Sequence, residues 1–429
     1  MAQTLKFGNK TWATKVGSTL AYNDENDNYK PLPFAFTRST SATRVNKEGL
    51  IEVVTNDRPR IDYTDTSDGV LLLEKAATNL ITYSEDFSNS YWTKDGTSVT
   101  SGFVSPDGTN NAFKLVQSSA NSRHFIKRRI DTSSSFLSNS IFVKAGEITK
   151  IGISESGSTD DYASFNLSNG VIIASGGNPS FSIKKMSNDW YRISLKSDSQ
   201  LSRNDFNLAL LSDDYVSGVP YSQSYQGDGT SGIYIWGAQV EAGNLSSYIP
   251  TQGSATTRVA ETASGSGNSE VFNDSEGVLF ANIAALATAP TRGITLGDGT
   301  SLNRIQFYYS SSNVLNGNLI TNGSGQVTGF SYNGDANLFN KCALKYKVND
   351  FAFWVNGFEV ATDTSGITPT GLNELNFDNG TGTSDFYGKT KEIGYYNTIL
   401  TDLELETLTS YKSWTSMVNE LNLNIIYNG

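Results

Sequence analysis

The chain has 429 residues and a formal charge of −11, from 32 lysines and arginines against 43 aspartates and glutamates. That balance argues against binding along nucleic acid, which requires a basic face. One cysteine, Cys342, and one histidine, His124, exclude a disulfide framework and a histidine-rich zinc site, and we expect no metal and no cofactor.

The first residues, MAQTLKFGNKTW, lack the apolar core of a secretory signal peptide. The longest apolar run, Gly277–Ala287, is too short to cross a bilayer. We therefore expect a chain that is made in a cytoplasm and has no membrane partner.

Residues 1–78 mix turn formers with short strands, and the run Val70–Glu74 predicts one buried strand. A region this polar is expected to lie along another surface, as an extended N-terminal segment. The loop after Asp24 begins like a calcium loop, with Asn26 and Asn28 at alternate positions. It has Ala35 where the glutamate at the twelfth position belongs, so no calcium site is predicted there.

Between residues 79 and 260, strands recur about every 8 to 12 residues and are separated by Gly, Ser, Asn and Asp turns. The clearest strands are Ile141–Ala145, Ala163–Leu167, Gly170–Ser175, Trp190–Ser197 and Gly232–Glu241. Ser168–Gly170 predicts a hairpin between the second and third of these strands. The pattern is typical of a β-sandwich or jelly roll, and residues 261–268 then have the small, polar composition of a linker.

A second sandwich is predicted over residues 269–415, with a tight hairpin turn at Asn356-Gly357. Thr401 and Glu404 form a capping box that predicts one short C-terminal helix. The tail, residues 416–429, alternates apolar and polar residues and predicts a terminal strand. The predicted fold class is therefore all-β: two β-sandwich (jelly-roll) domains after an extended N-terminal segment, with one short helix near the end.

Two stretches of the chain resemble known families. Asn79-LITYSEDFSNSYWTK, Pro106-DGTNNAFKLV, Asn188-DWYRISL and Gly232-IYIWGAQVEAGNLSSYIPTQGSATTR resemble a carbohydrate-binding-module-like jelly roll of bacteriophage head-fibre, spike and tail proteins. Phe36-TRSTSATRVNKEGLIE and Leu71-LLEKAATNLI look like the segment that precedes that domain. Ala352-FWVNGFEV and Lys391-EIGYYNTILTDLELETL resemble a laminin G-like, concanavalin A-like sandwich.

The resemblance implies a structural protein of a tailed-phage virion, trimeric like most fibres and spikes, and it carries over no catalytic residue. On this basis we expect a head fibre, spike or capsid decoration that is localised to the virion and contacts other capsid or tail proteins through residues 1–78. Two alternatives are a tail-associated protein that recognises host surface polysaccharide and a polysaccharide-degrading enzyme. The expectation adopted is a protein that is not an enzyme and that adheres to glycans.

Three loop tyrosines and one strand tryptophan are the candidate ligand-binding residues: Tyr215, Tyr221, Tyr225 and Trp354. The tyrosines lie in a long polar loop, the kind of segment that carries binding function, although a subunit contact explains them equally well. Trp354 lies on the opposite strand face from Phe351 and Phe353. It is expected either to pack in a core, the commoner role, or to present its ring to a sugar.

Other residues have a functional and a structural interpretation. Trp236 is predicted to pack in the core, whereas Trp92, near the start of the jelly roll, is predicted to be exposed. The basic run Arg123–Ile130 around His124 is expected to be a protected edge strand or a patch that meets an acidic neighbour. Adjacent carboxylates such as Asp160-Asp161 are ordinary in an acidic chain, so no catalytic pair is assigned.

Overall fold

A computed structural model describes residues 3–20, 31–132, 136–155, 161–197, 204–286, 291–421 and 423. Strands make up almost all of the regular secondary structure in the described residues, which confirms the all-β prediction. It forms two compact units. Unit 1 comprises residues 1–41, 54–75 and 259–429, and unit 2 comprises residues 42–53 and 76–258. None of the helices described is long and apolar enough to span a membrane.

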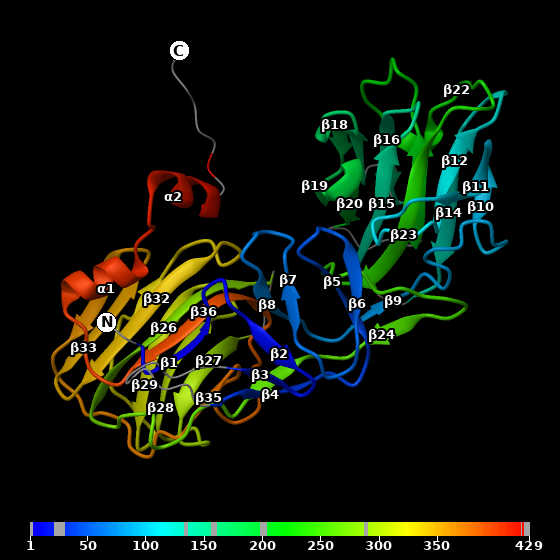
Figure 1. Ribbon diagram of the computed structural model, residues 1–429. Helices are drawn as coiled ribbons and strands as arrows, with labels where there is room; N and C mark the ends of the chain where they lie inside the picture. Colours follow the sequence, from blue (N-terminus) through cyan, green and yellow to red (C-terminus); the bar gives the residue numbers. More distant parts are fainter. Residues whose placement is uncertain are drawn as a thin grey trace, which may run out of the picture. The chain divides into compact units, whose positions relative to one another are not determined.

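Unit 1 is a sandwich of antiparallel strands (Figure 1). Its larger sheet has the order β34 (Phe358–Asp363), β33 (Asp350–Val355), β32 (Asn340–Lys347), β26 (Glu276–Ala285), β36 (Gly388–Tyr396), β8 (Val70–Leu73) and β7 (Arg60–Asp62), and β1 (Leu5–Gly8) also pairs with β36. The second sheet has the order β30 (Ser324–Gly325), β29 (Leu315–Thr321), β28 (Arg304–Tyr309), β27 (Arg292–Gly297) and β35 (Glu374–Asn376), with β31 (Ser331–Tyr332) beside β29. A smaller sheet joins β2 (Ala13–Lys15), β3 (Ser18–Leu20), β4 (Phe34–Thr37) and β25 (Thr262–Ser264).

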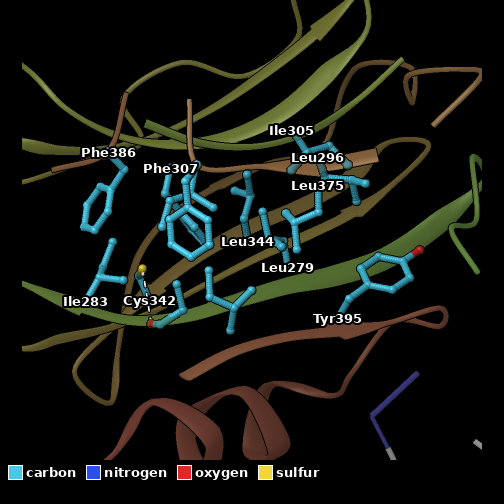
Figure 2. Close-up of a cluster of buried hydrophobic side chains, with 14 of the residues drawn as sticks. Leu279, Ile283, Leu296, Ile305, Phe307, Cys342, Leu344, Leu375, Phe386 and Tyr395 are labelled. Atoms are coloured by element: carbon cyan, nitrogen blue, oxygen red, sulfur yellow. Dashed lines mark hydrogen bonds between the residues drawn. The ribbon is translucent and has the colours of Figure 1, made fainter. Parts of the chain in front are cut away.

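The core of unit 1 lies between its two large sheets. Figure 2 shows Leu279, Ile283, Cys342 and Leu344 from one sheet meeting Leu296, Ile305, Phe307 and Leu375 from the other. The central strands are apolar on both faces because a second cluster covers the outer face. There Trp354, Phe280 and Ala343 pack against Leu405 of the helix α1 (Asp402–Thr409).

Residues 1–78, predicted to form one extended N-terminal segment, are divided between the two units. β1, β7 and β8 are strands of the large sheet of unit 1, and β2, β3 and β4 belong to its small sheet. Residues 42–53, with β5 (Ala42–Val45) and β6 (Ile51–Val54), fold with unit 2. The segment does lie along other surfaces, but its strands complete sheets whose other members come from much later in the chain.

A buried ionic cluster fixes this long-range pairing. The Glu261 carboxylate accepts hydrogen bonds from Arg38 Nη1 at 2.6 Å, from Arg60 Nε at 2.8 Å and from the Glu74 backbone N–H at 2.9 Å. Arg60 also pairs with Glu74 at 2.9 Å, and the side chains of Arg38, Arg60 and Glu261 are fully buried. Burial disfavours the charged form of Arg60, yet the two carboxylates outweigh it and raise its pKa.

The predicted linker, residues 261–268, is instead part of unit 1. It begins at buried Glu261 and continues as β25, which pairs with β4 in the register Ala263↔Phe36. Its small polar residues are compatible with a strand whose Ala263 is buried in the core. The composition of the segment therefore did not indicate that it contains a strand of unit 1.

The C-terminal part confirms one prediction and overturns another. α1 begins with the predicted capping box, in which the Thr401 and Glu404 side chains each bond the other residue's backbone N–H. Asn356 and Gly357 take φ of 52° and 88°, as a type I′ hairpin turn requires. The strand predicted over residues 416–429 is wrong, because α2 (Trp414–Glu420) occupies its start. The remainder of that prediction, apart from Leu421 and Leu423, lies outside the described residues.

Unit 2 is the second sandwich. One sheet has the order β10 (Thr93–Asp95), β14 (Phe125–Ile130), β21 (Asn204–Leu210), β16 (Lys150–Ser154), β17 (Tyr162–Asn166) and β18 (Val171–Gly176). The other has the order β11 (Thr97–Phe103), β12 (Ala112–Gln117), β23 (Gly232–Ala242), β15 (Leu137–Ala145), β20 (Trp190–Lys196) and β19 (Ser180–Lys185). The unit also contains two short strand pairs, β13 (Asn121–Ser122) with β22 (Tyr225–Gln226) and β9 (Ala77–Asn79) with β24 (Thr256–Arg258), and two short helices, η1 (Ser187–Asp189) and η2 (Pro220–Ser222).

Both faces of the second of these sheets are covered. Its inner face contributes to the main core of unit 2, and its outer face carries Phe142, Trp190 and Trp236 against Val45 and Ile51 of the β5–β6 hairpin. Trp236 is therefore a core residue, as predicted. The hairpin predicted at Ser168–Gly170 is also confirmed, since it joins β17 to β18.

Candidate functional site

A cavity of about 570 Å³ in unit 2 combines apolar faces with several hydrogen-bonding groups. We call it the Tyr83 pocket. Its lining consists of Tyr83, Glu85, Asp86, Ser101, Asn111, Phe113, Pro250, Thr251 and Gln252. Such a mixture of apolar walls and a few polar groups is typical of sites for small ligands.

A second cavity, of about 410 Å³, lies in unit 1 and is lined by several lysines. Three of these lysines already have partners inside the unit. Lys391 pairs with Glu420 at 3.2 Å, Lys10 pairs with Asp68 at 3.4 Å, and Lys341 donates to the Ser410 carbonyl at 2.9 Å. We therefore take the Tyr83 pocket as the candidate site.

Two chain segments, residues 82–84 and 251–253, form one wall of the pocket by pairing with each other. The Gly253 N–H donates to the Thr82 carbonyl at 2.7 Å, and Tyr83 forms a β-bridge with Gln252. Buried Ser84 and Thr251 exchange further bonds, including one from the Thr251 N–H to Ser84 Oγ at 2.8 Å. The backbone that carries Tyr83 is thus fixed on both sides.

Neighbouring aromatic residues hold the Tyr83 side chain in place. Its ring centroid lies 5.6 Å from that of Tyr91, and the Arg128 guanidinium sits 3.9 Å from the Tyr91 ring centroid. Trp92 Nε1 donates to the Tyr83 carbonyl at 3.0 Å. Trp92 is buried, so its predicted exposure is wrong: its indole packs on Phe87 and supports the pocket wall from inside. The result is a rigid aromatic surface, which loses little entropy on binding a ligand.

Glu85 and Asn111 form the polar part of the pocket. Tyr248 donates its hydroxyl to Glu85 Oε1 at 2.9 Å, and Asn111 Nδ2 donates to Glu85 Oε2 at 3.3 Å and to Asp107 Oδ2 at 3.4 Å. Because Nδ2 faces two carboxylates, the orientation of the Asn111 amide is determined. Its carbonyl oxygen is left buried without a hydrogen-bond partner in the described part of the chain.

The pocket is acidic in character. Burial raises the pKa of Glu85, the hydrogen bond from Tyr248 opposes that rise, and the charge of Asp107 adds to it. Asp86 also lines the cavity, whereas the described lining contains no lysine, arginine or histidine. The two charged groups of the described lining, Glu85 and Asp86, act only as hydrogen-bond acceptors when ionised.

The predicted tyrosine loop is packed rather than open. Tyr215 is buried and donates its hydroxyl to the Gly218 carbonyl at 2.6 Å. Tyr225 donates to Gln117 Oε1 at 2.7 Å, and Tyr221 stands edge-on to the Phe125 ring at 6.5 Å. At least Tyr215 and Tyr225 therefore hold the loop together, and a ligand role for the loop stays a prediction.

Trp354 and His124 occupy structural positions. Trp354 is 7 % exposed beneath α1, so it does not offer its ring to a sugar. His124 is buried, with Nδ1 2.7 Å from the Gly96 carbonyl oxygen and Nε2 3.1 Å from that of Tyr225. It thereby ties the loop of Tyr225 to the sandwich. The strand β14 that follows it is not at the edge of its sheet, because β10 pairs beyond it.

No group of three or more potential ligand residues that could hold a metal ion occurs in the ranges the structure describes. Most of the calcium-like loop after Asp24, residues 21–30, lies outside those ranges.

Sequence reasoning did not identify Tyr83, Glu85 or Asn111 as site residues. All three lie within the stretches Asn79–Lys94 and Pro106–Val116, which carry the jelly-roll resemblance. Their relevant property is that they converge in space, and no local spacing encodes that convergence.

Comparisons with known proteins give only distant similarities. No family model matches the chain, and neither does any curated protein. The CBM40 module of the Ruminococcus gnavus IT-sialidase, bound to α2,3-sialyllactose, is similar over 34% of this chain and 94% of that chain, with 19% identity and a TM-score of 0.28. A putative carbohydrate binding protein from Bacteroides ovatus matches over 66% and 78% of the two chains, with 12% identity and a TM-score of 0.25.

Mouse laminin α1 domains LG4-5 are similar over 65% of this chain and 86% of that chain, with 12% identity and a TM-score of 0.23. At such scores a likeness carries no argument about ligand or activity. The class of the protein, a β-sandwich protein of two compact units, rests on the strands themselves.

Proposed function

We propose that this chain is a non-enzymatic structural protein of a tailed-phage virion that binds glycans through the Tyr83 pocket. The observation that carries the binding function is the pocket itself, whose lining combines the Tyr83 side chain, held by Tyr91, with the carboxylates of Glu85 and Asp86. The virion setting is supported by the resemblance of residues 36–260 and 270–414 to head-fibre, spike and laminin G-like sequences.

The chemistry of a sugar suits these walls. A pyranose has C–H faces that pack on an aromatic ring and a rim of hydroxyls that donate hydrogen bonds. Tyr83 supplies an aromatic face, while Glu85, Asp86 and Gln252 supply oxygen acceptors. Hydrogen bonds to an ionised carboxylate are about twice as strong as neutral ones, so a few of them suffice to orient a ligand.

Binding fits the two carboxylates of the pocket better than hydrolysis does. Both oxygens of Glu85 are engaged by protein donors, and Asp86 Oδ1 accepts from the Ser88 backbone N–H at 3.1 Å and from its hydroxyl. A glycosidase needs one carboxyl group free to deliver a proton and a second placed about 5 to 10 Å from it across the bond. Release of reducing ends from host polysaccharide, lost on Glu85→Gln, would favour the enzyme instead.

Attachment to the particle is assigned to unit 1, because most of the residues expected to contact other virion proteins fold into it. The proposed assembly is a homotrimer that places the protein on the head as a fibre, spike or decoration, or on the tail as a receptor-binding protein. Light scattering of the purified chain tests the trimer. Gold-labelled antibody on intact phage particles distinguishes a head from a tail position, and absence of label on both rejects the virion proposal.

The binding experiment compares two sites in the same unit. Tyr83→Ala is expected to lower the affinity for host surface polysaccharide about tenfold or more, as truncation of an aromatic anchor does. Tyr221→Ala removes a half-exposed tyrosine from the loop predicted from sequence. If Tyr221→Ala abolishes binding and Tyr83→Ala leaves it intact, with both variants folded by circular dichroism, the loop is the site and the pocket assignment fails.

A further inference from the structure

If the Tyr83 pocket binds glycans as proposed, its charge determines which sugars it accepts. Each charged side chain among its described lining is a carboxylate, Glu85 or Asp86. A third carboxylate, Asp107, lies directly behind Asn111, to which it is hydrogen-bonded at 3.4 Å. A negatively charged ligand group entering this cavity meets charges of its own sign.

Two cations of unit 2, Lys94 and Arg128, are bonded to carbonyl groups outside the described lining. Lys94 Nζ is 3.4 Å from the Asn89 carbonyl and 3.5 Å from that of Trp92; burial lowers its pKa, and the charge of Asp86 opposes this. Arg128 lies on the Tyr91 ring and donates to the Tyr91 carbonyl at 3.1 Å. Neither residue belongs to the lining of the cavity. The described lining of the cavity therefore offers no cation to a carboxylate or sulfate group of a sugar.

The amide of Asn111 adds to the same preference. Its N–H groups are committed to Glu85 and Asp107, so the part of Asn111 that still lacks a partner in the described chain is its carbonyl oxygen, an acceptor. That oxygen is itself buried, so what matters for a ligand is that both N–H groups are occupied: Asn111 offers no free donor to an anion.

We infer that the Tyr83 pocket selects neutral sugars, whose hydroxyls donate to its acceptors, and rejects uronic and other acidic sugars. The formal charge of −11 on the whole chain acts in the same direction, because it repels anionic ligands before they reach the cavity. Two like charges about 5 Å apart near a protein surface change an affinity by about one hundredfold, and partial exposure reduces this to about tenfold.

Matched sugar pairs test the inference. Methyl glucoside and methyl glucuronide, and the corresponding galactose pair, differ only in a CH₂OH group against a carboxylate. Dissociation constants measured by NMR titration of the full chain at pH 8 are expected to favour the neutral member of a bound pair by about tenfold or more. The ratio of the dissociation constants of the acidic and the neutral sugar should fall toward one in 0.5 M salt, since screening weakens the repulsion.

Two variants assign the effect to the pocket. Glu85→Gln removes one carboxylate from the pocket and is expected to lower the ratio of the two dissociation constants severalfold. Asp131→Asn removes an exposed carboxylate elsewhere in unit 2 and should leave this ratio unchanged. An acidic sugar that binds the wild-type chain as tightly as its neutral partner overturns the inference while the glycan-binding function stands. Failure of every sugar to bind overturns both.

Discussion

The buried cluster around Glu261 gives the sharpest stability prediction. Glu261→Gln keeps the shape of the side chain and removes its charge. In the native protein the cluster contains two arginines and two glutamates, so its net charge is zero. The substitution leaves two buried guanidinium groups against the single carboxylate of Glu74. The new amide also turns two N–H groups toward a site where each neighbour, including Arg38 and Arg60, is a donor.

Breaking one partner out of a buried ion pair costs about 3 to 5 kcal/mol, and we expect Glu261→Gln to destabilise unit 1 by this amount. That is a large part of the 5 to 15 kcal/mol that typically stabilises a domain. Arg60 cannot relieve the strain by losing its proton, because an arginine remains protonated over the accessible pH range. Urea titration read by hydrogen-exchange mass spectrometry resolves the two units through their own peptides, and unit 2 should be unaffected.

Asp68→Asn is the matched control. Asp68 pairs with Lys10 at 3.4 Å in the same unit, but the two side chains are 39% and 67% exposed. An exposed pair of this kind contributes about 0 to 1 kcal/mol. If Glu261→Gln costs no more than Asp68→Asn, the cluster does not stabilise the fold in the way described.

Three further substitutions test local features. Burial and two neighbouring aspartates raise the pKa of Glu155 to about 8, so its contribution to stability should be lost as pH rises from about 4.5 to 8. Glu155→Gln should flatten this dependence of the free energy of unfolding on pH in urea titrations. An unchanged dependence would contradict the prediction. Thr401→Ala removes the helix cap that bonds Glu404 and should cost about 1 kcal/mol, with Thr401→Ser nearly neutral. Gly357 has φ 88°, and a Cβ added there would lie 2.6 Å from Ser410 Oγ. Gly357→Ala should therefore lower the free energy of unfolding by about 1 to 3 kcal/mol. A neutral result would show that the hairpin relaxes.

Features governed by adjacent residues were predictable from the sequence. The capping box at Thr401, the turn at Asn356-Gly357 and the hairpin at Ser168–Gly170 each depend on two to four consecutive residues, and all three occur as predicted. The all-β class follows in the same way, since alternation and turn spacing are local properties.

Long-range pairing was not predictable in this way. β8 was predicted as a buried strand, but its partner β36 lies more than three hundred residues later in the chain, and only the fold brings them together. Glu261 was placed in a linker because a charged residue among small polar ones resembles a solvated segment. Its partners, Arg38 and Arg60, stand about two hundred residues away, so no window of the sequence contains the cluster.

The candidate site was missed for a related reason. From the sequence alone, a tyrosine in a polar loop looks like a ligand contact, and this favoured Tyr215 and Tyr225. In the structure these side chains turn inward and bond their own loop and its neighbours. Tyr83 stands in a stretch that alternates like any strand, and it becomes part of a pocket only when residues 250–252 pair beside it and Asn111 is oriented by Asp107. A binding site of this kind is a property of three separate segments, so a structure, rather than a longer list of motifs, is needed to find it.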